Sequence, residues 1–245
     1  MQQNLNLVFN KHFLRIFRIA ENSIHILHEE PIDSKASFFR ENLKEVIRKN
    51  HQNPEKINLW YSPVKYTLIP STIFLPSKLE NYFELNFGKP AQEESIYYES
   101  IIPLNIVVVY AIPSWLLELK SEISIFGDIK SLITKQLLSI ERDKALGIVE
   151  CTIYNGYMDV YVKSKGNLVL ANHYEILNEN DLVYFLLLIK TKLNLNDQFM
   201  LNVKNIDSEI SNEKIKSLVV SIEDFKLVNL NFADNQTFYN SILCE

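Results

Sequence analysis

Acidic side chains are the first candidates for chemistry in this chain of 245 residues. Glu150 lies in a strand-like run, and Glu179 and Asp181 lie at the start of the helix predicted next. Carboxylates that converge on two metal ions carry out hydrolysis in many nucleases. Side chains alternate between the two faces of a strand, so Glu150 approaches the helical pair in only one of two orientations. Because the net charge of −5 also repels nucleic acid, we expect no nuclease and no metal site.

Histidine and cysteine residues do not form a catalytic or metal-binding motif. His25 and His28 are three positions apart on a predicted strand, which places their side chains on opposite faces. Neither Cys151 nor Cys244 has a His or Asn beside it in sequence. A residue that activates either thiol as a nucleophile would have to be brought near it by the fold. We expect Cys151 to be buried in a strand. Two distant cysteines favour reduced thiols in a cytoplasm over a disulfide.

Glycine limits the phosphate chemistry that the chain can support. Glycine-rich turns let backbone N–H groups approach a phosphate, and no Walker-type G-K-[ST] sequence takes their place here. Asn155-Gly156 favours a type I′ hairpin turn, because both central residues of that turn take positive φ. All five glycines are isolated: Gly88, Gly127, Gly147, Gly156 and Gly166.

The second half predicts a meander of three strands followed by a helix–strand–helix–strand run. Alternating apolar residues and two turn dipeptides define the strands, and Asn178 is a candidate N-cap with acidic residues in the first turn after it. We predict strands at 146–154, 157–165, 168–176, 199–205 and 225–232, and helices at about 179–193 and 211–221.

The first half repeats this order more loosely. We predict strands at 12–20 and 23–30 joined at Glu21-Asn22, a helix at about 37–49, strands at 57–61 and 104–112, and helices beginning at Ser114 and at about 129. Two such units in tandem predict a duplicated α/β protein. Its two subdomains would cover residues 1–143 and 144–245, with the boundary near 141–145.

A segment rich in proline and aromatic residues, 62–104, interrupts the first half. Disordered low-complexity segments contain few aromatic residues, so we predict an ordered insertion of short strands and turns. Its aromatic side chains either complete the core, which is the simpler interpretation, or form a surface that binds a partner.

Composition restricts the cellular setting. With 47% hydrophobic and 22% charged residues, the chain has the balance of a globular protein. Its basic residues are scattered and form no stripe that would bind nucleic acid. The N-terminal stretch has no signal-peptide apolar region, and the run at 182–189 is too short to span a bilayer. We therefore expect a cytoplasmic protein without membrane insertion.

Three stretches give the chain a family resemblance: "KYTLIPSTIFLPSKLENYFELNF", "IVVVYAIPSWLLELK" and "GNLVLANHYEILNENDLVYFLLLIKTKLNLN". With them the sequence resembles an uncharacterised bacterial family with an actin-like ATPase fold. That family is similar in architecture to the cytoplasmic actin-like proteins of type IV pilus assembly and type II secretion. The resemblance implies two ribonuclease-H-like subdomains, each with a mixed sheet flanked by helices, facing each other across a cleft. It implies no reaction.

In active actin-like ATPases, the turn between the first two strands of each subdomain carries an Asp-x-Gly pattern against the phosphates. The resemblance therefore makes Glu21, Asn22, Ser23, Asn155, Gly156 and Tyr157 the candidate ligand-binding positions. The first of these turns has no glycine, and the second has Tyr154 in place of an acid. The paired-glycine turn on the adenosine side is also missing, since no glycine follows Gly166.

These degenerate turns predict a non-catalytic binding or scaffold protein that needs no cofactor. Its partner would be another protein, and the oligomeric state stays open. One alternative is a divergent ATPase or phosphotransferase that binds nucleotide with side chains in place of glycine turns. Another is a small-ligand sensor that uses the cleft between the subdomains.

Overall fold

A computed structural model describes residues 5–10, 13–20, 23–32, 39–50, 57–122, 126–139, 147–154, 156–195, 199–206, 210–222, 225 and 228–233. The chain divides into two compact units. The first comprises residues 1–138 and 242–245, and the second comprises residues 139–241. The boundary predicted near 141–145 lies outside the described residues and stays a prediction.

The first unit is built on a mixed sheet in the order β3-β2-β1-β4-β8. β1 pairs antiparallel with β2 and parallel with β4, and β4 pairs parallel with β8. Helix α1 places Leu43 and Ile47 in the core, as its apolar stripe predicts. The elements are β1 (Leu5–Phe9), β2 (Phe13–Ala20), β3 (Ser23–Pro31), α1 (Phe39–Asn50), β4 (Ile57–Tyr61), α3 (Ser114–Glu122), β8 (Phe126–Ser131) and α4 (Leu132–Ser139).

Two elements of this unit differ from the sequence prediction. Leu5–Phe9 forms β1, an additional strand before the two that were predicted. Phe126–Ser131 forms strand β8, so the helix predicted from 129 begins only at Leu132. The hydroxyl of Ser131 accepts a hydrogen bond from the backbone N–H of Ile133 (3.2 Å) and so caps this helix, whereas a helix from 129 would have had Asp128 at that position.

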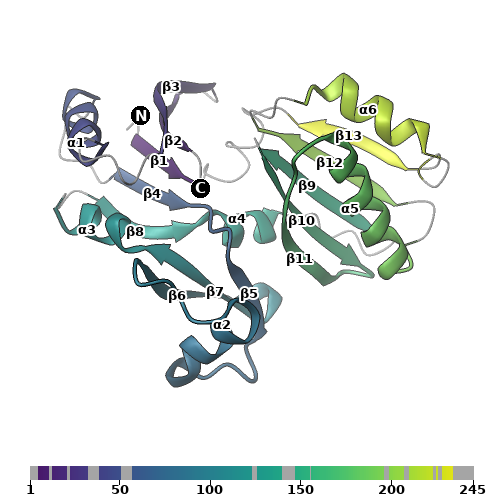
Figure 1. Cartoon of the computed structure of the whole chain (residues 1–245), viewed down its shortest axis with the longest axis horizontal. Coiled ribbons are helices and arrows are strands. Elements are labelled where there is room, and N and C mark those ends of the chain that lie inside the picture. The colour runs from purple at the N-terminus through teal and green to yellow at the C-terminus, as the bar shows by residue number, and fades with distance from the viewer. Residues whose placement is uncertain are drawn as a thin grey trace. The chain divides into compact units, whose positions relative to one another are not determined.

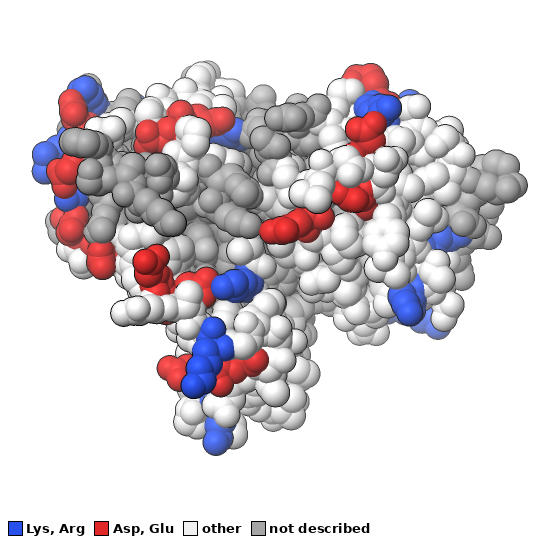
Figure 2. Space-filling model, viewed as in Figure 1, with Lys and Arg blue, Asp and Glu red and all other residues white. Residues whose placement is uncertain are grey.

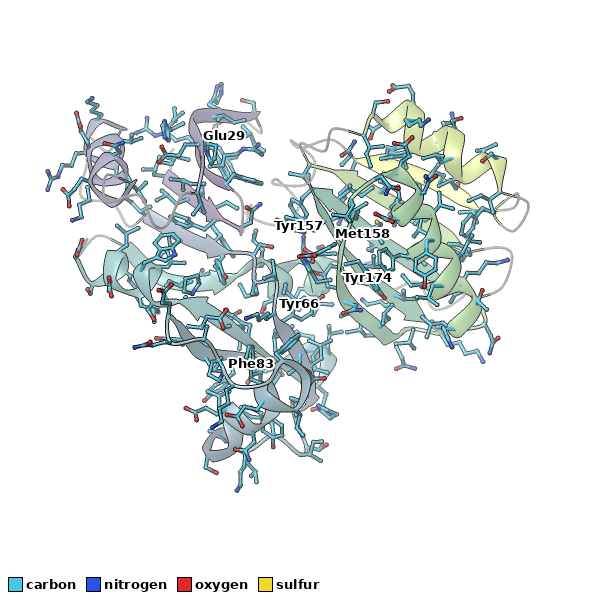
Figure 3. The ribbon with its side chains drawn as sticks, viewed as in Figure 1. Glu29, Tyr66, Phe83, Tyr157, Met158 and Tyr174 are labelled. Atoms are coloured by element: carbon cyan, nitrogen blue, oxygen red, sulfur yellow. The ribbon has the colours of Figure 1, made fainter. Side chains whose placement is uncertain are left out.

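The predicted insertion, 62–104, does not form a sheet alone: the strand predicted at 104–112 joins it as β7, and together they form a small antiparallel sheet in the order β5-β7-β6, with α2 on one face (Figure 1). Phe83 of α2 is buried against Val107 and Val109 of β7, and Figure 3 labels this residue within the insertion. Some aromatic residues therefore complete a local core, as the simpler interpretation predicts. The elements are β5 (Tyr66–Pro70), η1 (Pro76–Lys78), α2 (Leu79–Phe87), β6 (Glu94–Ile101), η2 (Ile102–Leu104) and β7 (Ile106–Pro113).

Glu99 of β6 joins the insertion to the main sheet of the first unit. Its Oε1 accepts hydrogen bonds from the hydroxyl of Tyr110 (2.6 Å) and from the backbone N–H of Ser131 (2.7 Å). Burial and the neighbouring Glu99 carboxylate raise the pKa of Tyr110 above its ordinary value, so the phenol stays protonated and donates this bond.

The second unit repeats the mixed sheet in the order β11-β10-β9-β12-β13. Asn178 caps α5 as predicted: its Oδ1 accepts from the backbone N–H of Asn180 (2.9 Å), and Asp181 completes a capping box. The elements are β9 (Ile148–Tyr154), β10 (Tyr157–Ser164), β11 (Asn167–Glu175), α5 (Glu179–Lys192), β12 (Met200–Asn205), α6 (Asn212–Ser221) and β13 (Asn229–Ala233).

Alternation along β9 and β10 separates the two faces of this sheet. Cys151, Met158 and Val160 belong to a core cluster with Leu182 and Leu186 of α5, so the apolar face lies under the helices. Burial of each such side chain stabilises the unit by about 2 kcal/mol. Figure 3 labels Tyr157 and Met158, consecutive residues whose side chains leave β10 on opposite faces.

Candidate functional site

The turn between the first two strands of the first unit runs from Asn10 to Phe13, because Leu5–Phe9 forms β1. The prediction placed this turn at Glu21–Ser23, and that alignment is wrong. Glu21 and Asn22 lie outside the described residues, between β2 and β3. Ser23 begins β3, where its Oγ lies 2.8 Å from Nε2 of His25.

Asn10 holds the first turn with its own side chain. Its Oδ1 accepts a hydrogen bond from the backbone N–H of Phe13 (2.7 Å), and its backbone N–H donates to the Phe13 carbonyl (3.1 Å). When the two sheets are aligned strand by strand, Asn10 lies at the position where the resemblance implies an aspartate. An amide that already closes its own hairpin is a poor substitute for the acid that organises magnesium and water.

The matching turn of the second unit joins β9 to β10. Tyr154 lies opposite Tyr157, and their rings stack at 4.6 Å between centroids. Gly156 takes a φ of 83°, as a type I′ turn requires, and its carbonyl accepts a hydrogen bond from the N–H of Ile176 (2.9 Å). Asn155 lies outside the described residues. Tyr154 occupies the acid's position, and its ring packs within the hairpin.

A hydrogen-bonded pair of ionisable side chains, Asp159 and His173, lies next to this turn. Asp159 of β10 stands directly opposite His173 of β11, and its Oδ1 lies 2.8 Å from His173 Nδ1. The ring of Tyr157 packs on the imidazole at 4.8 Å. Burial raises the pKa of Asp159, and the hydrogen bond and charge of His173 offset part of that rise. The second oxygen of Asp159, Oδ2, is buried and has no hydrogen-bond partner in the described part of the chain.

The same face of the sheet carries a chain of polar contacts across β9, β12 and β13. Asn202 donates through Nδ2 to Oε1 of Glu150 (2.6 Å), and Lys204 Nζ lies 3.3 Å from Oε2 of Glu150. Asn231 donates to Oδ1 of Asn202 (3.0 Å). Glu150 thus has an amide donor at Oε1 and a cation near Oε2, although Oε2 accepts no hydrogen bond in the described part of the chain.

The carboxylates considered for a nuclease do not meet. Glu150 lies on the face opposite the helix-side core that contains Cys151. Asp181 Oδ2 accepts from the backbone N–H groups of Leu177 and Asn178, and Glu179 lies 3.2 Å from Lys214. Over the described residues, no group of three or more His, Cys, Asp or Glu side chains is placed to hold a metal ion.

Cys151 is buried in the helix-side core, as predicted, with its Sγ 3.6 Å from the sulfur of Met158. Burial raises the pKa of this thiol above its ordinary value, with smaller contributions from Asp159 and Glu150. A thiol held protonated is a poor nucleophile. Cys244 lies outside the described residues.

The first unit has polar groups at the matching positions. Arg15 of β2 is 1% exposed and pairs with Glu29 of β3 at 2.6 Å. Asn58 donates to Oδ1 of Asn6 (3.1 Å), and the indole N–H of Trp60 donates to the same oxygen (3.4 Å). Sequence alternation alone does not reveal these pairs, since each joins strands that are distant in the chain or shifted in register.

Charged side chains on the surface alternate in sign. On the face shown in Figure 2, the described acidic and basic residues are interspersed and form no basic stripe. Helix α1 is an example: Lys44 lies 2.8 Å from Glu41 and 2.6 Å from Glu122, and Lys49 lies 2.8 Å from Glu45. Lys44 and Lys49 of α1 are thus each paired with acidic neighbours.

Solved structures define the class of protein. A Bacteroides thetaiotaomicron protein with an actin-like ATPase fold and unknown function aligns with a TM-score of 0.78 and 19% identity, over 100% of this chain and 96% of that one. The PilM–PilN type IV pilus biogenesis complex aligns with a TM-score of 0.57 and 11% identity, over 98% of this chain and 89% of that one. The chain has the actin-like ATPase fold, which confirms the predicted duplicated α/β architecture.

The chain belongs to the family described as "Protein of unknown function (DUF3822)", whose model matches residues 2–218. No curated protein matches the sequence. Among the helices that the structure describes, none combines the length and apolarity needed to cross a bilayer.

Proposed function

We propose that this protein is a non-catalytic binding or scaffold protein that keeps the actin-like fold without nucleotide chemistry. The observation that carries the proposal is the pair of hairpin turns. At the position of the phosphate-loop acid, the two units have Asn10 and Tyr154, and each side chain contributes to the packing or bonding of its own hairpin.

In sequence, neither turn combines the acid and the glycine that phosphate transfer uses in this fold. Catalysis of that reaction depends on a magnesium ion held by a carboxylate and on backbone N–H groups aimed at the phosphates. The first turn contains no glycine. The second has Gly156, but its neighbours Tyr154 and Tyr157 fill the hairpin with stacked rings.

A protein partner is the class of ligand that this architecture favours. The insertion exposes several large apolar side chains that its own core does not use, among them Ile73, Leu75 and Ile102. Exposed apolar groups of this kind often mark sites of protein binding. One protein of the same fold, PilM, is solved in a complex with PilN.

The test is whether partner capture needs nucleotide. The tagged full chain is incubated with lysate of its own source in EDTA and, separately, with magnesium and ATP. We expect the same proteins to be retained in both conditions. A partner retained only with magnesium and ATP would contradict the proposal and favour the divergent ATPase.

Asp159 favours a second candidate, a small-ligand sensor. A buried carboxylate oxygen without a donor is unfavourable by about 1–3 kcal/mol, and Oδ2 of Asp159 is such an atom in the described part of the chain. A ligand that donates a hydrogen bond there would raise the melting temperature by mass action. A screen of small amines and amides by thermal shift, repeated with Asp159→Asn, tests this: a hit that shifts both proteins equally would reject the site.

A further inference from the structure

Strand β6 ends the insertion sheet, and no strand among the described residues pairs with its outer edge. Glu93 and Ser114 form a hydrogen-bonded pair (Ser114 N–H to Glu93 carbonyl, 2.7 Å), and the β6–β7 register continues from it without a bulge. Bonding toward β7 therefore falls on alternate residues from Ser95 onward. The backbone groups of Ile96, Tyr98 and Ser100 face away from the sheet.

The bonds on the other side of β7 confirm this alternation. Ala111 donates its N–H to the Lys65 carbonyl (3.2 Å), so the backbone of Ala111 points toward β5. Its neighbours in sequence, Tyr110 and Ile112, must then point toward β6, where they stand opposite Tyr97 and Ser95. In the described part of the chain, no hydrogen bond is made by the outward backbone groups of Ile96, Tyr98 or Ser100.

Four other edge strands, β3, β8, β11 and β5, carry a bulge or a proline, which β6 lacks; β13 lacks both as well. Register shifts interrupt the pairing of β3 with β2, of β11 with β10 and of β8 with β4. Strand β5 ends in Pro70. Bulges, edge charges and prolines are the common means of preventing strands from pairing between molecules. Strand β6 has no bulge, lysine or proline in its eight residues.

Two exposed tyrosines flank this edge. Tyr98 is 43% exposed, lies on the α2 face and packs on Phe74 at 4.9 Å. Tyr97 is 42% exposed and lies on the other face. The two carboxylates of the strand are already engaged: Glu94 with Lys65 at 3.0 Å, and Glu99 with Tyr110 and Ser131. The edge therefore offers backbone groups and aromatic surface without an unpaired charge.

The sequence of the edge is complementary to itself. In antiparallel pairing about a two-fold axis, outward-facing residues must pair with outward-facing residues, so Glu94 of one copy never stands opposite Glu99 of the other. With the axis at Tyr97, that residue meets its own copy and Ile96 meets Tyr98. The remaining pairs join a serine to a glutamate: Ser95 with Glu99, and Ser100 with Glu94. The tyrosine pair and the Ile96–Tyr98 pair are of favourable kinds, and the serine–glutamate pairs place no like charges opposite each other.

We propose that β6 pairs antiparallel with β6 of a second copy of this chain, which joins the two insertion sheets into one continuous sheet. Ile96, Tyr98 and Ser100 donate the backbone hydrogen bonds, and the tyrosines cover both faces of the junction. The interface is isologous, as expected for a homodimer. It is independent of the proposed function.

Light scattering coupled to size-exclusion chromatography tests the interface at high micromolar protein concentration. We expect the wild type to have twice the mass of one chain. Ser100→Pro removes an outward N–H that the monomer does not use, and Tyr98→Lys places a charge on the edge; both should give the mass of one chain. Leu85→Lys, on the 83% exposed residue of α2, is the matched control and should stay dimeric.

A monomeric wild type would overturn the proposal, and so would a dimer that survives both edge variants. Circular dichroism checks that each variant is folded. The register has a separate test in a Cys244→Ser background. Tyr97→Cys should form a covalent dimer on oxidation, because non-hydrogen-bonded pairs bring the Cβ atoms close enough for a disulfide. Ser95→Cys should not, because its copy lies about 14 Å away along the strand. Equal cross-linking of both variants would contradict the pairing.

Discussion

The main sheets of the two units carry pairs of ionisable side chains at matching positions, and the buried member is an arginine in one unit and an aspartate in the other. In the first unit the second strand contributes Arg15, which pairs with Glu29 on the third strand. In the second unit the equivalent residue of the second strand is Asp159, which pairs with His173 on the third. Both pairs connect the second strand to the third in the same topology. The second strand contributes a cation in one unit and an anion in the other.

A matching position on the first strand of each unit shows the same divergence. Asn6 in the first unit and Glu150 in the second both accept a hydrogen bond from an asparagine on the parallel neighbour, Asn58 or Asn202. The side-chain amide is conserved between the two units, whereas its partner has changed from an amide to a carboxylate.

This comparison separates what the fold requires from what chemistry would require. The apolar face of each sheet must be kept for the core, because the helices pack there. On the polar face, any buried group is tolerated provided that it is paired. Asn10 and Tyr154 stand where the resemblance puts acids, which supports the proposal that phosphate transfer no longer constrains the two turns.

The largest expected effect on stability comes from breaking the Asp159–His173 pair of the second unit. His173→Ala leaves Asp159, which is 0% exposed, without its hydrogen-bond partner. We expect a loss of about 3 kcal/mol in the free energy of unfolding, measured by urea denaturation. Adding Asp159→Asn to His173→Ala should recover part of this loss, since an amide is less costly to bury than a carboxylate.

Glu29→Ala is the matched variant in the first unit. Glu29 is 43% exposed, and Arg15 keeps the Phe13 ring at 5.2 Å from its guanidinium carbon. The expected loss is about 1 kcal/mol. Equal losses for Glu29→Ala and His173→Ala would show that the two pairs are equivalent despite their different burial, against this account.

The next largest effect on stability comes from replacing a glycine in each of the two units with alanine. Gly156 has a φ of 83°, where an alanine is strained, and no atom within 4 Å would contact its Cβ. Gly156→Ala should therefore lower the unfolding free energy by about 1 kcal/mol through backbone strain alone. Gly127→Ala in β8 is the control: its Cβ would meet only the Ile57 carbonyl at 3.5 Å, an ordinary contact, so stability should be unchanged or slightly higher. A larger loss at Gly127 would refute the assignment of strain to the hairpin.

The smallest effect is a pH dependence. The pKa of Asp159 is raised by burial, so between its unfolded and folded pKa values the native state binds more protons than the unfolded state. Wild-type stability then falls as pH rises through the folded pKa. Asp159→Asn lacks this dependence, and its stability relative to the wild type should be higher at pH 7 than at pH 5. Urea denaturation at both pH values measures the difference, and the reverse order would show that pairing with His173 outweighs burial.

Much of the second unit could be predicted because its patterns are local. The helix cap at Asn178 and the turn at Gly156 are encoded by adjacent residues. The Asp159–His173 pair could not be predicted. Counting back from the Gly166 turn places Asp159 opposite Asn172, and only the register shift between Val162 and Lys163 brings His173 into line.

The first unit was harder to predict for a different reason. Asn6 interrupts the apolar run of β1 and Asn10 follows it, so these five residues, buried on both faces, show none of the alternation that predicts a strand. Without β1 in the count, β2 and β3 are taken as the first two strands, and the predicted phosphate turn falls between them at Glu21–Ser23. In β8, Gly127 and Asp128 resemble a loop and a helix cap in sequence, and the strand is defined by the pairing of the residues on either side of them, Phe126 and Ile129–Ser131, with β4.

The most direct test of the account is isothermal titration of the folded full chain with ATP in the presence of magnesium, repeated in EDTA. With Asn10 and Tyr154 in place of the phosphate-loop acids, we predict no binding heat in either condition. Saturable binding with a Kd of about 1 μM that requires magnesium would contradict the central claim that nucleotide chemistry has been lost from both turns.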